Sequence, residues 1–235
     1  MTRSEMIETD IELDMVAAAG RIGLIALATD FYSENELRRF LPTDVEIFTN
    51  RVLNANPLTL QNLRNMAADI SRAAAGILPG LKLDAMIYGC TSGTIANGVD
   101  RIEQLIQQSC PDILVTNPVS AVLSAMQHLN AQRVSILTPY IEEVNNEMAE
   151  YFCQQNIDVI NITGLGFDDD IDITGIPPQV IVDSALASCD ASADLLFISC
   201  TSLRTPDIIE PLEQKLDKPV ITSNQALVWH TLKLI

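Results

Sequence analysis

A tripeptide that occurs twice constrains this chain more than any other feature of its sequence. Cys-Thr-Ser stands at residues 90–92 and again at residues 200–202, almost half the chain apart. In each copy a short apolar run leads directly into the cysteine. A fold with one thiol at the same place in each of two halves can put both thiols on opposite sides of a shared cleft. Such an arrangement suits the transfer of protons to and from carbon.

Two further pairs of segments repeat at nearly the same spacing. Residues 21–26 resemble residues 133–138, and residues 111–117 resemble residues 219–224. Three similar pairs in the same chain order indicate an internal duplication rather than a chance match. We therefore expect two lobes with the same internal architecture.

Short apolar runs alternate with amphipathic segments in both halves. This alternation predicts parallel strands joined by helices. The runs are apolar throughout, which is typical of strands that are buried on both faces. Residues 62–75 and 95–107 have apolar residues on one helical face, and each segment is predicted to form one helix. The eight predicted strands are residues 22–27, 45–49, 85–88, 113–115, 134–137, 159–162, 195–198 and 220–222.

The predicted fold class is α/β, with two pseudo-symmetric flavodoxin-like lobes, a four-stranded parallel sheet in each lobe, and a site in the cleft between them. Ligands in such folds bind beyond the carboxyl ends of the strands, where both Cys-Thr-Ser copies are placed. The N-terminal lobe is expected to comprise residues 1–118 and the C-terminal lobe residues 119–223. Since Asn224 repeats Asn117, the final helix, residues 224–235, is expected to cross back and pack on the first lobe.

The chain is strongly acidic. Its 31 Asp and Glu residues exceed its 14 Lys and Arg residues and give a formal net charge of −17. Such a surface repels phosphate backbones, so we expect no nucleic-acid binding. No apolar run approaches the roughly 18–20 residues of a membrane span, so no membrane association is expected. Residues 1–19 are acidic and lack the basic start and apolar middle of a secretion signal, which predicts a cytoplasmic location.

Five cysteines and two histidines limit the metal and disulfide chemistry of the chain. An odd number of cysteines in a reducing compartment argues against structural disulfides. There is no Cys-x-x-Cys pair, and we expect no metal site. Cys110, Cys153 and Cys189 lack the strand-end context and are expected to be small, buried, apolar residues. Asp84 and Asp194 precede the two key strands and are expected to stabilise turns.

The two Cys-Thr-Ser copies are the predicted site. A cysteine where a strand ends and a helix begins faces several unpaired backbone N–H groups. Those groups favour the thiolate, so we expect the pKa of Cys90 and of Cys200 to be lowered. The same groups can hold a substrate carboxylate or an enolate-like oxygen. The neighbouring hydroxyl residues that can donate there are Thr91, Ser92, Thr201 and Ser202.

Five segments, taken in order, resemble one group of proteins. They are residues 21–25, 89–93, 137–140, 164–166 and 199–202. This set is similar to the aspartate/glutamate racemase superfamily and, within it, to the maleate isomerase and arylmalonate decarboxylase group. The resemblance runs from the first of these segments to the C-terminus. It implies two pseudo-symmetric lobes with the site between them, no cofactor, and a homo-oligomer, either a dimer or a tetramer.

The resemblance also implies roles for individual residues. In the isomerases of the group, a cysteine at the position of Cys90 attacks the substrate, and one at the position of Cys200 donates a proton. In the racemases the two cysteines act as opposed acid and base. The arylmalonate decarboxylases have glycine at the first position, so the presence of both cysteines argues against decarboxylation. Tyr140 falls where the family places a tyrosine that hydrogen-bonds a substrate oxygen, and a wall residue at a strand end is the alternative.

Two positions depart from the maleate isomerase pattern. Asp30 and Asp170 stand where those enzymes carry asparagines. Ionised carboxylates cannot donate a hydrogen bond to a substrate carboxylate, and they attract a cation. Without the resemblance, the run of aspartates at 168–170 would be typical of a solvated loop. Residues 27–30 resemble the branch associated with bacterial ectoine utilisation, and ectoine is a zwitterion with one carboxylate and a cationic ring.

The sequence therefore predicts a cofactor-independent isomerase or racemase whose substrate is a small carboxylate, with a zwitterion favoured by the two aspartates. Racemisation beside the carboxylate and cis–trans isomerisation by thiolate addition both stay open. A second interpretation is a decarboxylase or hydrolase that uses Cys200 alone. A third is a two-lobe protein that binds a small molecule without catalysis, although matched thiols have no evident use in binding.

Overall fold

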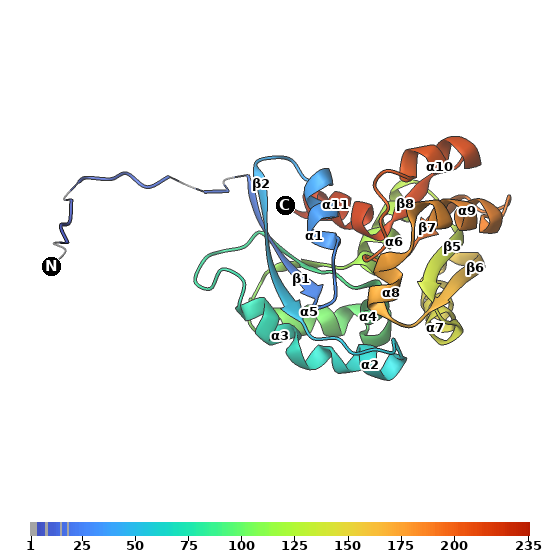
Figure 1. Cartoon of the computed structure of the whole chain (residues 1–235), viewed down its shortest axis with the longest axis horizontal. Coiled ribbons are helices and arrows are strands. Elements are labelled where there is room, and N and C mark those ends of the chain that lie inside the picture. Colours follow the sequence, from blue (N-terminus) through green and yellow to red (C-terminus); the bar gives the residue numbers. More distant parts are fainter. Residues whose placement is uncertain (1–3, 8, 15, 18) are drawn as a thin grey trace.

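The protein consists of two lobes, each built around a four-stranded parallel sheet (Figure 1). The computed structural model describes residues 4–7, 9–14, 16–17 and 19–235. The first sheet has the strand order β2-β1-β3-β4, and the second has the order β6-β5-β7-β8. The strands are β1 (Gly20–Leu27), β2 (Val45–Val52), β3 (Ala85–Tyr88), β4 (Leu114–Thr116), β5 (Arg133–Tyr140), β6 (Asp158–Phe167), β7 (Leu195–Ile198) and β8 (Val220–Thr222).

The strand order confirms the predicted α/β fold class. The second sheet repeats the first with every strand number raised by four, and all pairs of neighbouring strands are parallel. All eight predicted strands are present. The four central strands, β1, β3, β5 and β7, are almost completely buried, as their apolar sequences predict.

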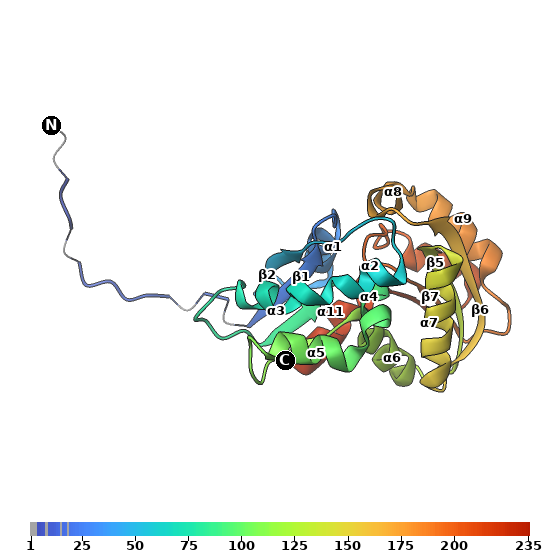
Figure 2. The ribbon, with the colours of Figure 1, turned by 90° about the horizontal axis from the view of Figure 1, so that it is seen from below.

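Helices cover the sheets on both faces. Figure 1 places the first sheet between α1 and α11 on one side and α3 and α5 on the other, and Figure 2 shows α7 along the second sheet. The helices are α1 (Ser33–Phe40), α2 (Leu60–Asn65), α3 (Ala67–Ala75), α4 (Thr91–Asn97), α5 (Val99–Gln107), α6 (Pro118–His128), α7 (Glu142–Gln154), α8 (Asp170–Gly175), α9 (Pro178–Ser188), α10 (Ile209–Leu216) and α11 (Ser223–Leu234). Within the described residues, none of these helices has both the length and the apolar character needed to cross a membrane.

Each of the two helices predicted from apolar spacing is in fact a pair of shorter helices. The segment 62–75 is divided at Met66, where α2 ends and α3 begins. The segment 95–107 is interrupted by Gly98, whose φ of 83° lies outside the helical region and separates α4 from α5. Apolar spacing reports which side of a segment is buried, and a break of one residue leaves that pattern intact.

The two halves share an aspartate contact between strands as well as their topology. The Asp84 carboxylate accepts a hydrogen bond of 2.8 Å from the backbone N–H of Arg21. Its counterpart Asp194 accepts one of 2.8 Å from the backbone N–H of Arg133. Each aspartate ties the start of its own strand to the neighbouring central strand. Both residues therefore have a structural role between strands, and the expectation that they stabilise turns stays a prediction.

The final helix follows a strand of the second sheet and returns to the first lobe. Thr222 ends β8, and its side chain caps α11. From there α11 packs against α6 and α1 and against β3 and β4 of the first sheet. Asn117 is itself the cap of α6, so its structural counterpart is Thr222 and not Asn224. The lobe boundaries at residues 118 and 223 stay a prediction.

Candidate active site

Cys90 follows the carboxyl end of β3, where it caps α4. Its side chain is buried, with 3% of its surface exposed. The sulfur accepts a hydrogen bond of 3.2 Å from the backbone N–H of Gly93, and the Ser92 hydroxyl lies 3.7 Å from it. Cys90 therefore has the strand-end, helix-start position that the sequence predicts.

Cys200 follows the equivalent strand, β7, but does not begin a helix. It is buried, with 6% exposed, and its sulfur accepts a hydrogen bond of 3.4 Å from the backbone N–H of Ser202. The next helix, α10, starts only at Ile209. A side-chain carbon at Gly93 in the first copy would press on Met66, Tyr88 and Cys90, whereas the second copy has Leu203 at that position. The predicted strand-to-helix turn is thus wrong for the second copy.

The backbone of Cys200 has an unusual conformation. Its φ is 126°, in a region that residues with a side chain rarely adopt. Such a conformation persists only where the surrounding structure fixes it. The Cys200 N–H donates a hydrogen bond of 3.0 Å to the Ser223 hydroxyl at the start of α11. The turn is therefore held in place by a helix that also packs on the first lobe.

Hydrogen bonds join the two Cys-Thr-Ser turns. The Thr201 hydroxyl donates to the carbonyl of Gly89 at 3.0 Å. The hydroxyls of Thr91 and Ser223 lie 3.0 Å apart. Two segments that are far apart in the sequence thus meet at the carboxyl ends of β3 and β7, as the duplication predicts.

Tyr140 connects the two thiols through its hydroxyl. It ends β5, is buried, and forms hydrogen bonds with Cys200 and with Ser92. Ser92 also lies beside Cys90, so the hydroxyls of Ser92 and Tyr140 form a polar path between the two sulfur atoms. The pKa of Cys90 is raised mainly by burial, next by the charge of Asp170, and to a smaller extent by the charge of Cys200. The predicted residues of the two turns and Tyr140 therefore form one cluster.

The pKa values of the thiols differ from the sequence-based expectation. Burial raises the pKa of Cys90 to about 12, and it raises the pKa of Cys200 to about 12. Hydrogen bonds from Gly93 to Cys90 and from Tyr140 to Cys200 act in the opposite direction, but their effect is smaller. The expected lowering is wrong for the free protein because removal from water outweighs the few donors that face each sulfur. Both thiols are neutral at pH 7.

Asp30 and Asp170 lie close to the cysteines. Asp30 accepts hydrogen bonds from the backbone N–H groups of Tyr32 and Ser33, at 2.9 and 2.8 Å. Burial raises the pKa of Asp30, and it raises the pKa of Asp170 to about 6. The charges of both aspartates also raise the pKa of Cys200, after the main effect of burial. Asp170 is buried, so the solvated-loop interpretation is wrong for this residue.

Glu36 is a buried acid behind the second turn that sequence reasoning missed. Its carboxylate accepts a hydrogen bond of 3.1 Å from the backbone N–H of Thr205 and one of 2.9 Å from the Asn224 side chain. The same Asn224 amide donates to the carbonyl of Thr201 at 2.9 Å. Glu36 and Asn224 thus hold the turn that contains Cys200. In the sequence Glu36 resembles an ordinary acidic residue of an amphipathic helix, and no local pattern distinguishes it.

Replacement of Glu36 by glutamine is expected to flatten the pH dependence of stability. Burial raises the pKa of Glu36 from 4.5 to about 7 in the folded protein. The folded state therefore holds the proton more tightly than the unfolded chain, and the resulting stabilisation is complete below pH 4.5 and lost as the pH rises to about 7. The loss is on the order of 3 kcal/mol. Urea unfolding of the wild type and of Glu36→Gln across this range measures it.

The matched control for this measurement is Glu34→Gln. Glu34 lies on the same helix and forms a surface ion pair of 3.0 Å with Arg51. Its replacement is expected to leave the slope of stability against pH unchanged. Equal slopes for the wild type and Glu36→Gln would contradict the assignment.

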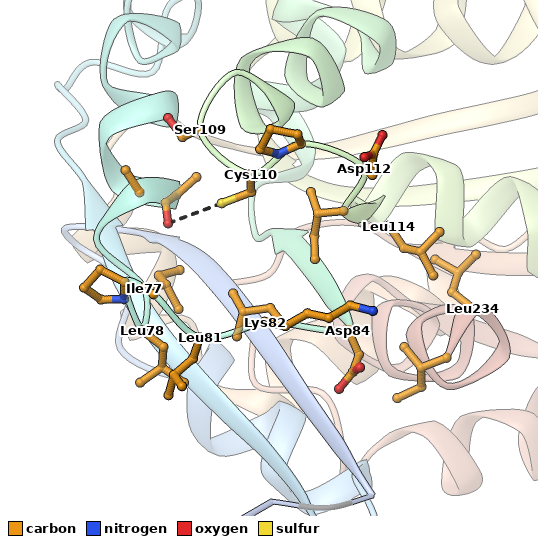
Figure 3. Close-up of a pocket in the computed structure, with 18 of the residues that line it drawn as sticks. Ile77, Leu78, Leu81, Lys82, Asp84, Ser109, Cys110, Asp112, Leu114 and Leu234 are labelled. Atoms are coloured by element: carbon orange, nitrogen blue, oxygen red, sulfur yellow. Dashed lines mark hydrogen bonds between the residues drawn. The ribbon is translucent and has the colours of Figure 1, made fainter.

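A separate cavity of about 840 Å³ lies at the opposite end of the first sheet (Figure 3). Its lining includes Lys82, Asp84 and Cys110, and the Cys110 sulfur donates to a backbone carbonyl there. None of the predicted site residues lines it.

Cys153 is exposed, and Cys110 and Cys189 are half-buried, so the expected burial of these three cysteines is wrong. Among the residues that the structure describes, no three histidine, cysteine or acidic side chains gather as metal ligands would.

Comparison with known proteins identifies the family. The family model described as arylmalonate decarboxylase matches residues 85–235, which include both Cys-Thr-Ser turns, Tyr140 and Asp170. The chain belongs to the arylmalonate decarboxylase family. The resemblance to the maleate isomerase and arylmalonate decarboxylase group of the racemase superfamily is thereby confirmed.

The relatives of this chain include maleate isomerases and an arylmalonate decarboxylase. The maleate isomerase of Geobacillus stearothermophilus is 21% identical over 228 residues, which cover 91% of this chain and 90% of the relative. The arylmalonate decarboxylase of Bordetella bronchiseptica is 27% identical over 121 residues, or 51% of this chain and 50% of that protein.

Solved structures from the same group share the fold. The maleate cis-trans isomerase of Nocardia farcinica, solved with a covalently bound succinylcysteine intermediate, has a TM-score of 0.84 at 21% identity, with 92% of each chain covered. A crystal structure of arylmalonate decarboxylase has a TM-score of 0.71 at 19% identity, with 91% of this chain and 92% of that chain covered. The two-lobe α/β architecture is therefore that of the arylmalonate decarboxylase family, and the roles of individual residues stay predictions.

Proposed function

We propose that this protein is a cofactor-independent isomerase that acts on a small carboxylate through Cys90 and Cys200. The observation that carries the proposal is the cluster in which both thiols, Ser92 and Tyr140 lie together at the equivalent ends of β3 and β7. Two buried thiols at related positions can act on one carbon from opposite sides. The similarity to maleate isomerases along nine-tenths of the chain supports an isomerase.

Two reaction routes use the same pair of sulfurs. In racemisation, one thiolate removes the proton beside the carboxylate, and the opposite thiol returns a proton to the other face of the carbon. In cis–trans isomerisation, the Cys90 sulfur bonds to one carbon of a double bond while the other carbon takes a proton from Cys200. Rotation about the resulting single bond follows. Return of that proton to Cys200 then expels the sulfur and restores the double bond.

The addition route has support from a relative. The Nocardia farcinica maleate cis-trans isomerase was solved with a covalently bound succinylcysteine intermediate. Such an adduct is what thiolate addition to maleate produces. For this chain, backbone N–H groups and the hydroxyls beside the two cysteines would hold the substrate carboxylate.

We further propose that the substrate carries a positive charge as well as a carboxylate. Asp30 and Asp170 are buried acids near Cys200, and their charges add to the pKa increase that burial causes there. A second substrate carboxylate would meet repulsion at these side chains, and a cation would meet attraction. Ectoine-like zwitterions fit this description better than maleate does. We expect the enzyme to act as a homo-oligomer in the cytoplasm.

Proton NMR in deuterated water tests the proposal. The enzyme is incubated with amino acids, with ectoine-like zwitterions and with maleate. The expected result is exchange of the hydrogen beside a carboxylate for deuterium, or conversion of a cis into a trans double bond. The double variant Cys90→Ser/Cys200→Ser is the control and should do neither. Release of carbon dioxide from an arylmalonate, with no exchange or isomerisation of any compound, would overturn the proposal in favour of a decarboxylase.

A competition experiment tests the substrate class. Zwitterions with one carboxylate are expected to protect the cysteines from alkylation at lower concentrations than dicarboxylates of similar size. Stronger protection by dicarboxylates would contradict the role given to Asp30 and Asp170.

A further inference from the structure

Tyr88 carries a buried hydroxyl with no hydrogen-bond partner. It is the last residue of β3, two positions before Cys90, and its side chain is fully buried. Among the residues that the structure describes, no donor or acceptor pairs with its phenol oxygen. Buried hydroxyls nearly always have partners, because an unpaired one destabilises the folded state. An exception next to a reactive thiol points to a partner that is present only during the reaction.

The Tyr88 hydroxyl points toward the same space as the Cys90 sulfur. A side-chain carbon added at Gly93 would lie 2.7 Å from the Tyr88 oxygen and 2.9 Å from the Cys90 sulfur. Both atoms therefore lie next to the same position in the first turn of α4, and the glycine leaves them room. Burial raises the pKa of Tyr88 well above its ordinary value, and the nearby charge of Cys90 raises it further. The phenol consequently keeps its proton when Cys90 is ionised.

The resting site offers few donors to a charge on Cys90. The sulfur accepts a hydrogen bond of 3.2 Å from the Gly93 N–H, and the Ser92 hydroxyl lies at the longer distance of 3.7 Å. Burial raises the pKa of this thiol to about 12, so the thiolate that the reaction needs is costly to form. One additional donor within reach would lower that cost, since hydrogen bonds to charged groups are the strong ones.

We propose that the Tyr88 hydroxyl donates a hydrogen bond to the thiolate form of Cys90 and so stabilises the nucleophile. The proton stays on the tyrosine oxygen, and no covalent bond is made or broken in this step. This inference rests on the proposed function only in requiring that Cys90 ionises during the reaction. It gives Tyr88 a catalytic role in addition to that of Ser92, whose hydroxyl lies 3.7 Å from the Cys90 sulfur, whereas the Tyr140 hydroxyl is hydrogen-bonded to Cys200 and Ser92.

Alkylation of Cys90 in Tyr88→Phe tests the proposal without knowledge of the substrate. Wild type and variant are treated with iodoacetamide, a reagent of the size of a small substrate, at several pH values from 7 to 9. Mass spectrometry then follows the peptides that contain Cys90 and Cys200 in the same sample. Because only the thiolate reacts, the variant should alkylate Cys90 about tenfold more slowly, and Cys200 at the rate of the wild type.

Three outcomes would overturn the proposal. They are a full alkylation rate of Cys90 in the variant, an equal slowing of both cysteines through altered access, and no reaction of Cys90 in the wild type. Tyr151→Phe on α7 is the matched control and should change neither rate, because the pKa of Tyr151 responds to burial and to Asp100 and not to a cysteine. The alkylation test does not measure isomerase activity. A failure of the Tyr88 proposal can therefore be distinguished from a failure of the proposed function.

Thermal unfolding of the same variant separates this role from a structural one. Tyr88→Phe removes one oxygen atom that has no partner, so the variant is expected to unfold at the same temperature as the wild type or a higher one. A lower unfolding temperature would show that the hydroxyl stabilises the resting fold, and it would count against the proposal.

Discussion

Replacement of Cys90 or Cys200 by serine is expected to lower kcat by about 10²–10⁴-fold, the range typical of acid–base groups. A serine hydroxyl does not ionise near neutral pH and cannot act as the nucleophile or as the base. The fold should survive both changes. Serine is a good helix cap and can accept the hydrogen bond that the Gly93 N–H now gives to Cys90. Steady-state kinetics on the substrate found by NMR provides the measurement.

The pattern across variants distinguishes a paired mechanism from a mechanism with one cysteine. If the two thiols act as a unit, the double variant should lose little more activity than either single variant. The exposed Cys153 offers a control, and Cys153→Ser should retain full activity. Full activity in Cys90→Ser would end the two-thiol scheme and favour a reaction through Cys200 alone.

Tyr140→Phe is expected to lower kcat by roughly 10–100-fold, with a smaller change in KM. The Tyr140 hydroxyl hydrogen-bonds Cys200 and holds down the pKa of that thiol against the larger effect of burial. A hydrogen bond to a charged group contributes roughly 1.5–3 kcal/mol, which corresponds to about one to two orders of magnitude in rate. The ionisation of Cys200 should therefore move to higher pH in the variant. A pH–rate profile of kcat measures both effects.

Two results would contradict this role for Tyr140. A normal kcat in Tyr140→Phe would mean that the hydroxyl only fills space at the end of β5. A lower kcat with an unshifted profile would place its contact on the substrate instead of on Cys200. Thermal unfolding of the variant provides the control for a general loss of structure.

The sequence contains enough information to predict the architecture. The four central strands are recognisable because they are almost completely buried, so their apolar character is continuous and does not depend on register. The meeting of the two Cys-Thr-Ser turns follows from the duplication, since equivalent strands end at equivalent edges. Helix continuity is harder to predict. Gly98 breaks a helix whose apolar spacing continues undisturbed on either side.

The properties that sequence reasoning missed are those that depend on contacts between distant segments. The pKa of each thiol follows from burial, which is created where the turns, Tyr140 and the adjoining elements pack together, and no local pattern encodes it. Glu36 has its role only because α11 returns to the first lobe and brings Asn224 to it. Tyr88 belongs to an ordinary apolar strand, and only the missing partner of its hydroxyl marks it.

The backbone of Cys200 bears on how this enzyme can evolve. A φ of 126° suits glycine, and a residue with a side chain in such a region costs about 1–3 kcal/mol. Selection for heat resistance alone would therefore favour glycine at this position and remove the sulfur with the strain. Directed evolution of this protein needs a screen for turnover at every round, because a more thermostable variant can lack the catalytic thiol.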